Sequence, residues 1–217
     1  MTKLAEAGEH LRVIRSLMER ATVYRSISAP TALIGGLLSL GGFATAYYAK
    51  HHRHHVLTPS QFLVVWLVVL ALTGLSNLIF LWRGAGMRHE PFFSAGMKCA
   101  VTSLAPAFLT AGVLTFIIHR PIQLCILWIV LYGLGLLATQ HFAPRSLVLL
   151  GTAFFAWGCV LMATWKHLFL AHGQTEPSTL VVSGIMAGTF GGVHLAYAAA
   201  VWALGEEREG APDPDHV

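Results

Sequence analysis

Histidine is the reactive side chain that the sequence holds in excess, with 12 copies among 217 residues. Seven of them flank apolar stretches on what we predict below to be one side of a membrane: His51, His52, His54, His55, His119, His167 and His172. Imidazole is a good ligand for Zn²⁺, Cu²⁺ or Ni²⁺, and a histidine-rich tract beside a membrane can collect such ions. These residues are therefore a candidate metal site. No Cys, Asp or Glu accompanies the tract, so a polar loop rich in histidine is the simpler alternative.

His194 differs from the others because it lies inside a long apolar stretch, directly after Gly191-Gly192-Val193. An ionisable side chain at membrane depth is costly, so His194 should face the interior of a helix bundle and meet a polar partner or water. The available partners are Asn77, Ser76, Ser103 and Thr110 within other apolar stretches, and Gln140 just beyond the end of another. We treat His194, together with Asn77, as a candidate ligand-binding or proton-coupling site. The alternative is a neutral histidine that only fixes helix packing.

Haem ligation is a further possible role for His194. The sequence does not identify a cofactor. Ligation by two histidines would need a second one at equal depth, whereas His119, His141 and His167 stand near the ends of apolar stretches. No residue is assigned as catalytic or cofactor-binding. The apolar stretches contain no carboxylate pair, and the chain has no His-Glu-x-x-His, Gly-x-Ser-x-Gly or Walker-type sequence. The sequence therefore favours a non-enzymatic protein.

Six apolar stretches without Asp, Glu, Lys or Arg must position these histidines. Each is long enough to cross roughly 30 Å of hydrocarbon as a helix. The predicted spans are Thr31–Ala49, Phe62–Trp82, Cys99–Ile118, Ile122–Thr139, Leu147–Trp165 and Leu180–Leu204. Thr58-Pro59-Ser60-Gln61 predicts a capping box at the second start, because Thr and Gln three residues apart can each accept from the other's backbone N–H. We therefore predict an all-α, polytopic membrane protein, with one transmembrane domain over residues 30–205 and a disordered cytoplasmic tail over 206–217.

The orientation follows from the basic residues, which are retained on the cytoplasmic side of a membrane. With the N-terminus inside, the inner segments hold ten of the 14 Lys and Arg, whereas the outer segments hold Lys50, Arg53, Arg120 and Lys166. Both termini are therefore expected in the cytoplasm. The net charge is +4, and most of the charged residues stand beside the predicted spans. Anionic lipid rather than nucleic acid is thus the expected partner.

Residues 1–29 predict an amphipathic helix at the cytoplasmic face. Its apolar residues recur at intervals of three and four, and its polar positions include Arg12, Arg15, Arg20 and Arg25. Such a helix can lie on the inner leaflet with its arginines on lipid phosphate. The same stripe could pair with a second copy of the chain or with a cytoplasmic protein. Both interpretations stay open.

Two rows of small residues predict close helix packing. Gly184, Gly188 and Gly192 form a glycine-zipper row in the last span, and Ser183, Ala187 and Gly191 form a second row beside it. The first span has a comparable face, made of Gly35, Ser39 and Gly42. Small residues let two helix backbones approach, which drives association in lipid. These faces are expected to pack on a neighbour within the bundle or across a dimer.

The stretch from Leu17 to Gly36, LMERATVYRSISAPTALIGG, resembles the opening of uncharacterised bacterial six-helix inner-membrane proteins. The resemblance implies a bacterial inner-membrane location and supplies no activity. In size and helix count the chain is also similar to the substrate-binding membrane subunits of vitamin-uptake transporters. Because it lacks catalytic motifs and has a basic N-terminal helix, the sequence favours a sensor, regulator or accessory subunit. The alternative is a small-solute or metal-ion transporter subunit with a pocket near His194.

Overall fold

The computed structural model describes residues 29–87, 95–170 and 176–209. Arg12, Arg15, Arg20, Arg25 and the rest of the predicted N-terminal helix before Ala29 lie outside this part of the chain, as do His172 and residues 210–217. Within the described residues the structure is helical and has no strand. Six helices are long and apolar enough to cross a membrane. The chain is therefore an all-α, multi-pass membrane protein.

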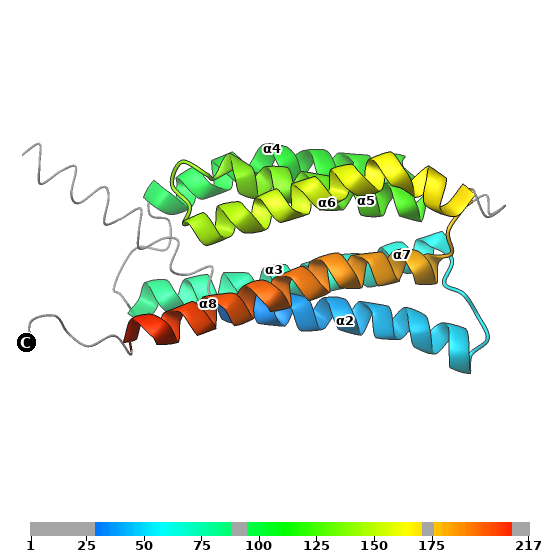
Figure 1. Ribbon diagram of the computed structural model, residues 1–217, viewed down its shortest axis with the longest axis horizontal. Coiled ribbons are helices and arrows are strands. Elements are labelled where there is room, and N and C mark those ends of the chain that lie inside the picture. Colours follow the sequence, from blue (N-terminus) through cyan, green and yellow to red (C-terminus); the bar gives the residue numbers. More distant parts are fainter. Residues whose placement is uncertain (1–28, 88–94, 171–175, 210–217) are drawn as a thin grey trace, which may run out of the picture.

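The helices follow the predicted spans; each begins before its span, and all but the third and fourth also end beyond it. Five are continuous: α2 (Ala29–His52), α3 (Pro59–Met87), α4 (Ala95–Ile117), α5 (Pro121–Ala138) and α6 (Arg145–Leu170). The last helix has three parts, namely α7 (Thr179–Met186), the π-helical segment η1 (Ala187–Val193) and α8 (His194–Glu209) (Figure 1). Because α8 ends at Glu209, residues 206–209 are helical and do not belong to a disordered tail.

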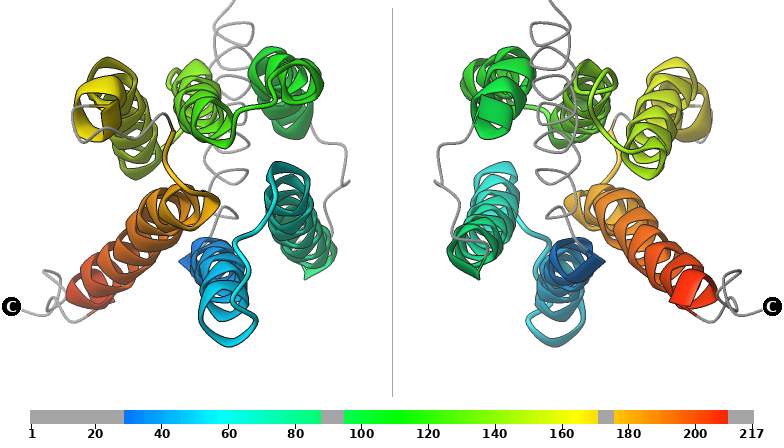
Figure 2. Two further views of the ribbon diagram at one scale, coloured as in Figure 1. Left: turned by 90° about the vertical axis from the view of Figure 1, so that its right-hand side faces the viewer. Right: turned by 90° about the vertical axis from the view of Figure 1, so that its left-hand side faces the viewer.

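The helices form two layers. Viewed from either end, α4, α5 and α6 lie on one side, and α2, α3 and the last helix lie on the other (Figure 2). Within the layers α5 packs most extensively on α6, and α2 packs on both α3 and the last helix. By contrast α3 and α4, which follow each other in the chain, barely contact each other.

The predicted capping box at the start of α3 is confirmed. The N–H of Thr58 donates to Oε1 of Gln61 at 3.0 Å, and the N–H of Gln61 donates to Oγ1 of Thr58 at 3.2 Å. Two backbone donors that have no partner within the helix are thereby satisfied. The cap fixes the residue at which α3 begins.

The α5·α6 contact is a backbone contact made through glycines. A Cβ added at Gly133 of α5 would lie 2.5 Å from the backbone N of Phe155 and 2.9 Å from the carbonyl oxygen of Gly151 on α6. One at Gly158 would lie 2.6 Å from Cγ2 of Val130. Only glycine permits this separation. We call this contact the α5·α6 seam.

The predicted glycine row of the last helix is not the row that packs. Gly188 and Gly192 are exposed, with open space where a Cβ would be, and Gly184 has only Phe43 nearby. The second row is the buried one. There Gly191 approaches Gly36 of α2, and a Cβ added at Gly36 would lie 3.1 Å from the carbonyl oxygen of Gly191. The rows differ little in side-chain size, so size could not choose between them.

The face of α2 made of Gly35, Ser39 and Gly42 is buried, as expected, but Gly35 and Gly42 pack on α3 rather than on the last helix. A Cβ at Gly35 would lie 3.1 Å from Cγ2 of Thr73, and one at Gly42 would lie 3.1 Å from Cγ2 of Val69. α2 therefore presents different small residues to two neighbours. It joins α3 to the last helix within one layer.

Contacts at the two ends of the bundle join segments that are far apart in the sequence. Ala29 and Ala32 of α2 pack on Ala198 of α8, so the start of the first described helix and the last helix meet at one end. At the opposite end Arg120, in the turn between α4 and α5, forms a 2.8 Å ion pair with Glu176. This ion pair links the two layers away from the chain ends.

Candidate functional site

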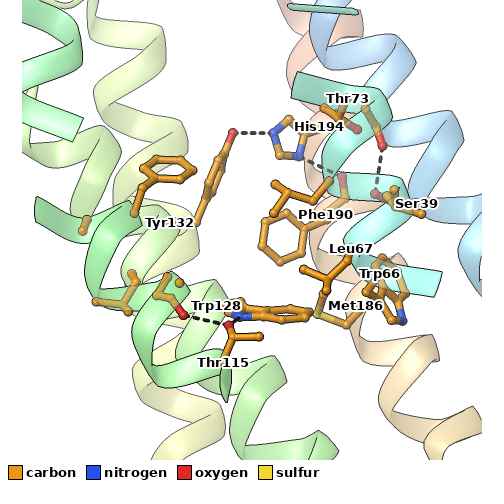
Figure 3. A pocket seen from close by; sticks show the side chains of 18 of the residues that line it. Ser39, Trp66, Leu67, Thr73, Thr115, Trp128, Tyr132, Met186, Phe190 and His194 are labelled. Carbon is orange, nitrogen blue, oxygen red and sulfur yellow. Dashed lines mark hydrogen bonds between the residues drawn. The ribbon is translucent and has the colours of Figure 1, made fainter. Parts of the chain in front are cut away.

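A cavity of about 230 Å³ lies between the two layers. Residues from α2, α3, α4, α5 and the last helix line it, and α6 contributes none (Figure 3). The lining is mainly aliphatic and aromatic, and it contains no Asp, Glu, Lys or Arg. Apolar cavities with a few convergent polar groups are the usual form of a small-molecule site. The cavity is therefore the candidate functional site.

The cavity opens toward the side of the bundle between α3 and α4. Leu70 of α3, and Gly112 and Phe116 of α4, line the cavity and are also exposed, Phe116 to 79%. We call these three residues the lateral mouth. Because all three belong to membrane-spanning helices, the mouth faces the acyl chains of the bilayer rather than water.

His194 lines the cavity, and both of its ring nitrogens are engaged. Nδ1 lies 2.8 Å from the carbonyl oxygen of Phe190, and Nε2 lies 2.8 Å from the hydroxyl of Tyr132 (Figure 3). A carbonyl can only accept, so Nδ1 carries the hydrogen. In the neutral imidazole Nε2 then accepts from the Tyr132 hydroxyl. The structure thereby fixes the tautomer of His194 through the backbone of its own helix.

None of the partners predicted for His194 is the one that it meets. Tyr132 was missed because a tyrosine in an apolar span counts as hydrophobic in any search for polar residues. One signal was available: a buried tyrosine hydroxyl needs a hydrogen-bond partner, and Tyr132 stands in the middle of the predicted span Ile122–Thr139.

Aromatic rings hold the Tyr132–His194 pair in place. The Tyr132 ring meets Phe154 of α6 at a centroid distance of 4.8 Å and Phe190 of η1 at 5.3 Å, both in edge-to-face geometry. Phe154 also lies 5.2 Å from the His194 ring. Such contacts leave little rotational freedom to either polar ring.

The π-helical segment η1 ends directly before His194, and it supplies Phe190 to the cavity wall. π-helical turns are rare and occur frequently at functional sites. Nothing in the glycine-rich sequence distinguished this segment from an ordinary α-helix. It is the second feature of the site that sequence reasoning missed.

Asn77, the second predicted site residue, lies on α3 and does not line the cavity. Its Oδ1 is buried and has no hydrogen-bond partner among the described residues, and the same holds for Oγ1 of Thr31 on α2. The structure therefore does not bring Asn77 together with His194 at one site.

The described outer histidines do not converge on a metal site. The part of the chain that the structure describes holds no group of three or more His, Cys, Asp or Glu side chains able to share an ion. His51 stacks on Tyr47 with a centroid distance of 3.9 Å, and Nε2 of His55 lies 3.1 Å from Oε1 of Gln61. His52, His54, His119 and His167 are exposed at the same end of the bundle. For haem, His194 offers no free nitrogen while Tyr132 and Phe190 occupy both.

Comparison of the chain with protein-family models, with curated proteins and with solved structures finds no match.

Proposed function

We propose that this protein binds a lipid-soluble molecule in the cavity and acts as a non-enzymatic sensor, regulator or accessory subunit. The observation that carries the proposal is the lateral mouth, which joins an apolar cavity to the acyl-chain region between α3 and α4. A molecule dissolved in the bilayer can enter there without crossing water. The two layers then enclose it on the remaining sides.

The chemistry of the lining supports an uncharged, mostly apolar ligand. An ion or a charged headgroup would lose its hydration inside the cavity, and no charged side chain lines the wall to compensate. The polar side chains of the wall are neutral: the hydroxyls of residues such as Ser39, Thr115 and Tyr132, the indole N–H groups of Trp66 and Trp128, and the imidazole of His194. They can orient a ligand by hydrogen bonds without offering it a charge.

The location belongs to the same proposal. A bacterial inner membrane, with both termini in the cytoplasm, is supported by the resemblance of Leu17–Gly36 and by the excess of basic residues on one side of the predicted spans. On this orientation the predicted N-terminal helix, with Arg12, Arg15 and Arg20, stands at the cytoplasmic face. Contact of that helix with lipid, a second copy or a cytoplasmic partner would connect ligand occupancy to an output.

A transporter of a small neutral solute is the second candidate, and the position of His194 in the cavity wall favours it. The two functions make different demands on the protein. Transport requires the cavity to open to both sides of the membrane, and its rate should depend on the Tyr132–His194 pair. Flux of solute into liposomes that is abolished by His194→Ala would favour transport. A sensor should instead keep its ligand and lose its output when Arg12, Arg15 and Arg20 are replaced.

The proposed binding is tested by closing the mouth. A photoreactive hexadecyl chain, with a diazirine at mid-chain, is added to liposomes that contain the protein, and labelled residues are mapped by mass spectrometry. We expect labels on cavity residues, reduced at least about fivefold in Gly112→Trp because the indole fills the mouth. Gly112 has open space around it, so the substitution meets no backbone.

Gly74→Trp is the matched control, because Gly74 is exposed on α3, has equally open surroundings and does not line the cavity. Cavity labelling should be unchanged in this variant. Labels confined to outward-facing residues, or cavity labelling that Gly112→Trp leaves intact, would overturn the proposal.

A further inference from the structure

We infer that the ligand is an uncharged lipid bearing a hydroxyl group, and that Thr73 of α3 recognises this hydroxyl. The inference rests on the proposed function and names the class of molecule that the cavity takes. It follows from the hydrogen bonds that the wall has already made and from those that it can still make.

Most polar hydrogens of the cavity wall are already donated within the protein. The Tyr132 hydroxyl donates to His194, and the Trp128 indole N–H donates to Oγ1 of Thr115 at 2.8 Å. The hydroxyls of Thr115 and Ser39 donate to the carbonyl oxygens of their own helices at 2.7 and 2.8 Å. These groups retain lone pairs and can accept from a ligand. They have no hydrogen left to offer.

Thr73 departs from this pattern. Threonines in the middle of helices commonly donate to a carbonyl three or four residues earlier, as Thr110 and Thr164 do here at 2.8 and 2.7 Å. The Thr73 hydroxyl makes no such bond within the described residues, and the Thr73 carbonyl instead accepts from Ser76 at 2.8 Å. Its side chain lines the cavity, close to the labelled Ser39 (Figure 3). The hydroxyl of Thr73 is therefore available to a ligand.

A hydroxyl in hydrocarbon without a partner is costly, because no water is present to satisfy it. A ligand hydroxyl removes this cost for both molecules. It can accept from Thr73 and donate its own hydrogen to an unused lone pair of the wall, such as those of Ser39 or Tyr132. The wall thus matches a group that both donates and accepts.

Other lipid headgroups match the wall less well. A fatty acid or phosphate would place a negative charge where no positive side chain lines the cavity. A carbonyl-only group, as in a quinone, can accept from Thr73 but cannot use the remaining lone pairs. An alcohol uses both capacities.

The cavity takes only part of such a molecule. Its volume of about 230 Å³ lies below the roughly 300–1,000 Å³ of pockets that enclose most of a small ligand. The hydroxyl and the neighbouring carbons fit inside, and the remaining chain leaves through the lateral mouth into the bilayer. This arrangement requires a long apolar tail and a compact head.

Two photoreactive probes that differ only at the head test the inference. One is hexadecanol with a mid-chain diazirine, and the other is its methyl ether, which can accept but not donate. With the wild-type protein in liposomes we expect the alcohol to label cavity residues about fivefold more than the ether, the factor that one net hydrogen bond gives. Equal labelling by both probes would overturn the inference while leaving the proposed function standing.

Variants test the hydrogen bond that Thr73 donates. Thr73→Val keeps the side-chain shape and removes the hydroxyl that donates to the oxygen of either probe, so labelling of cavity residues by the alcohol and by the ether should each fall about fivefold. Thr110→Val, at an exposed threonine that does not line the cavity, should keep the wild-type level of labelling by both probes. Labelling by both probes that Thr73→Val leaves at the wild-type level would refute the role of Thr73. Absence of cavity labelling by either probe in the wild-type protein would refute the proposed function as well.

Discussion

Two pairs of neighbouring helices in this membrane protein pack in opposite ways. α5 and α6 are in close contact along the α5·α6 seam, whereas α3 and α4 stand apart on another side of the bundle. At the seam, Gly133, Gly151 and Gly158 allow direct contact between helices, with Gly133 set against the backbone of α6. Between α3 and α4 contact is minimal, and bulky side chains such as Leu70 and Phe116 remain exposed. Lipid is as apolar as these side chains, so burying them would gain little. Close packing in a membrane therefore has to be built from small residues that face each other, and where bulky side chains stand between two helices a cavity can persist.

The two sides also differ in what a glycine does there. Gly133 faces backbone atoms of α6, whereas Gly112 of α4 has open space around it at the mouth. The same residue type is required for contact on one side and leaves the mouth wide on the other. Substituting each glycine by alanine therefore distinguishes those required for helix contact from those that shape the cavity.

The largest expected effect comes from adding one methyl group to the seam. In Gly133→Ala the new Cβ meets backbone atoms at 2.5 and 2.9 Å, so α5 and α6 must separate. Overpacking of this kind costs about 1–3 kcal/mol or more, which lowers the melting temperature by roughly 6 to 12 °C at the upper value. The measurement is thermal loss of the monodisperse peak in size-exclusion chromatography.

Gly112→Ala is the control for the seam, because the same methyl group enters open space at the mouth. Its melting temperature should stay at or slightly above that of the wild-type protein, since alanine is the better helix former. Equal destabilisation by both substitutions would show that the two sides are not packed differently.

An intermediate effect is expected across the cavity, where Tyr132 and His194 join the two layers by a hydrogen bond. We expect a double-mutant cycle with Tyr132→Phe and His194→Ala to give a coupling free energy of about 0.6 to 1.7 kcal/mol, between the mean and the maximum measured for such bonds between membrane helices. The measurement is reversible unfolding in mixed detergent micelles. As a control, Tyr132→Phe and Thr110→Val affect different hydrogen bonds, so their losses of stability should add. A coupling free energy of zero for Tyr132 and His194 would show that their hydrogen bond does not stabilise the bundle.

The smallest effect is expected at the end of the bundle, where Arg120 and Glu176 form a further link between the layers. Their side chains are 59% and 36% exposed, so solvent and salt screen the pair. Arg120→Gln should cost less than about 1 kcal/mol, and the loss should vanish at high salt. The double reversal, Arg120→Glu with Glu176→Arg, should recover stability at low salt. A large, salt-independent loss would mean that this turn holds the layers together.

The sequence was sufficient for the fold class because its signals are local and strong. Charge-free apolar stretches predicted all six spanning helices, and Thr58 with Gln61 predicted the cap that begins α3. The depth of His194 predicted that it needs a polar partner, and the structure supplies one. Each of these inferences depends only on residues within one helix.

The features that the sequence did not yield depend on how helices are rotated against each other. Tyr132 meets His194 because α5 and α8 present these side chains to the same cavity, and no pattern within either helix encodes that. The choice between the Gly188 and Gly191 rows depends on the same rotation, which the π-helical η1 alters within the last helix. Side-chain size and periodicity cannot supply it.

The lateral mouth has a consequence for how occupancy of the cavity is controlled. A molecule that enters from the acyl chains is drawn from a two-dimensional solution, so the relevant concentration is its mole fraction among the lipids. Adding water would not release it, whereas adding empty vesicles would. The protein would accordingly respond to the composition of its own membrane, and its half-saturation point would be a ratio of ligand to lipid rather than a molar concentration.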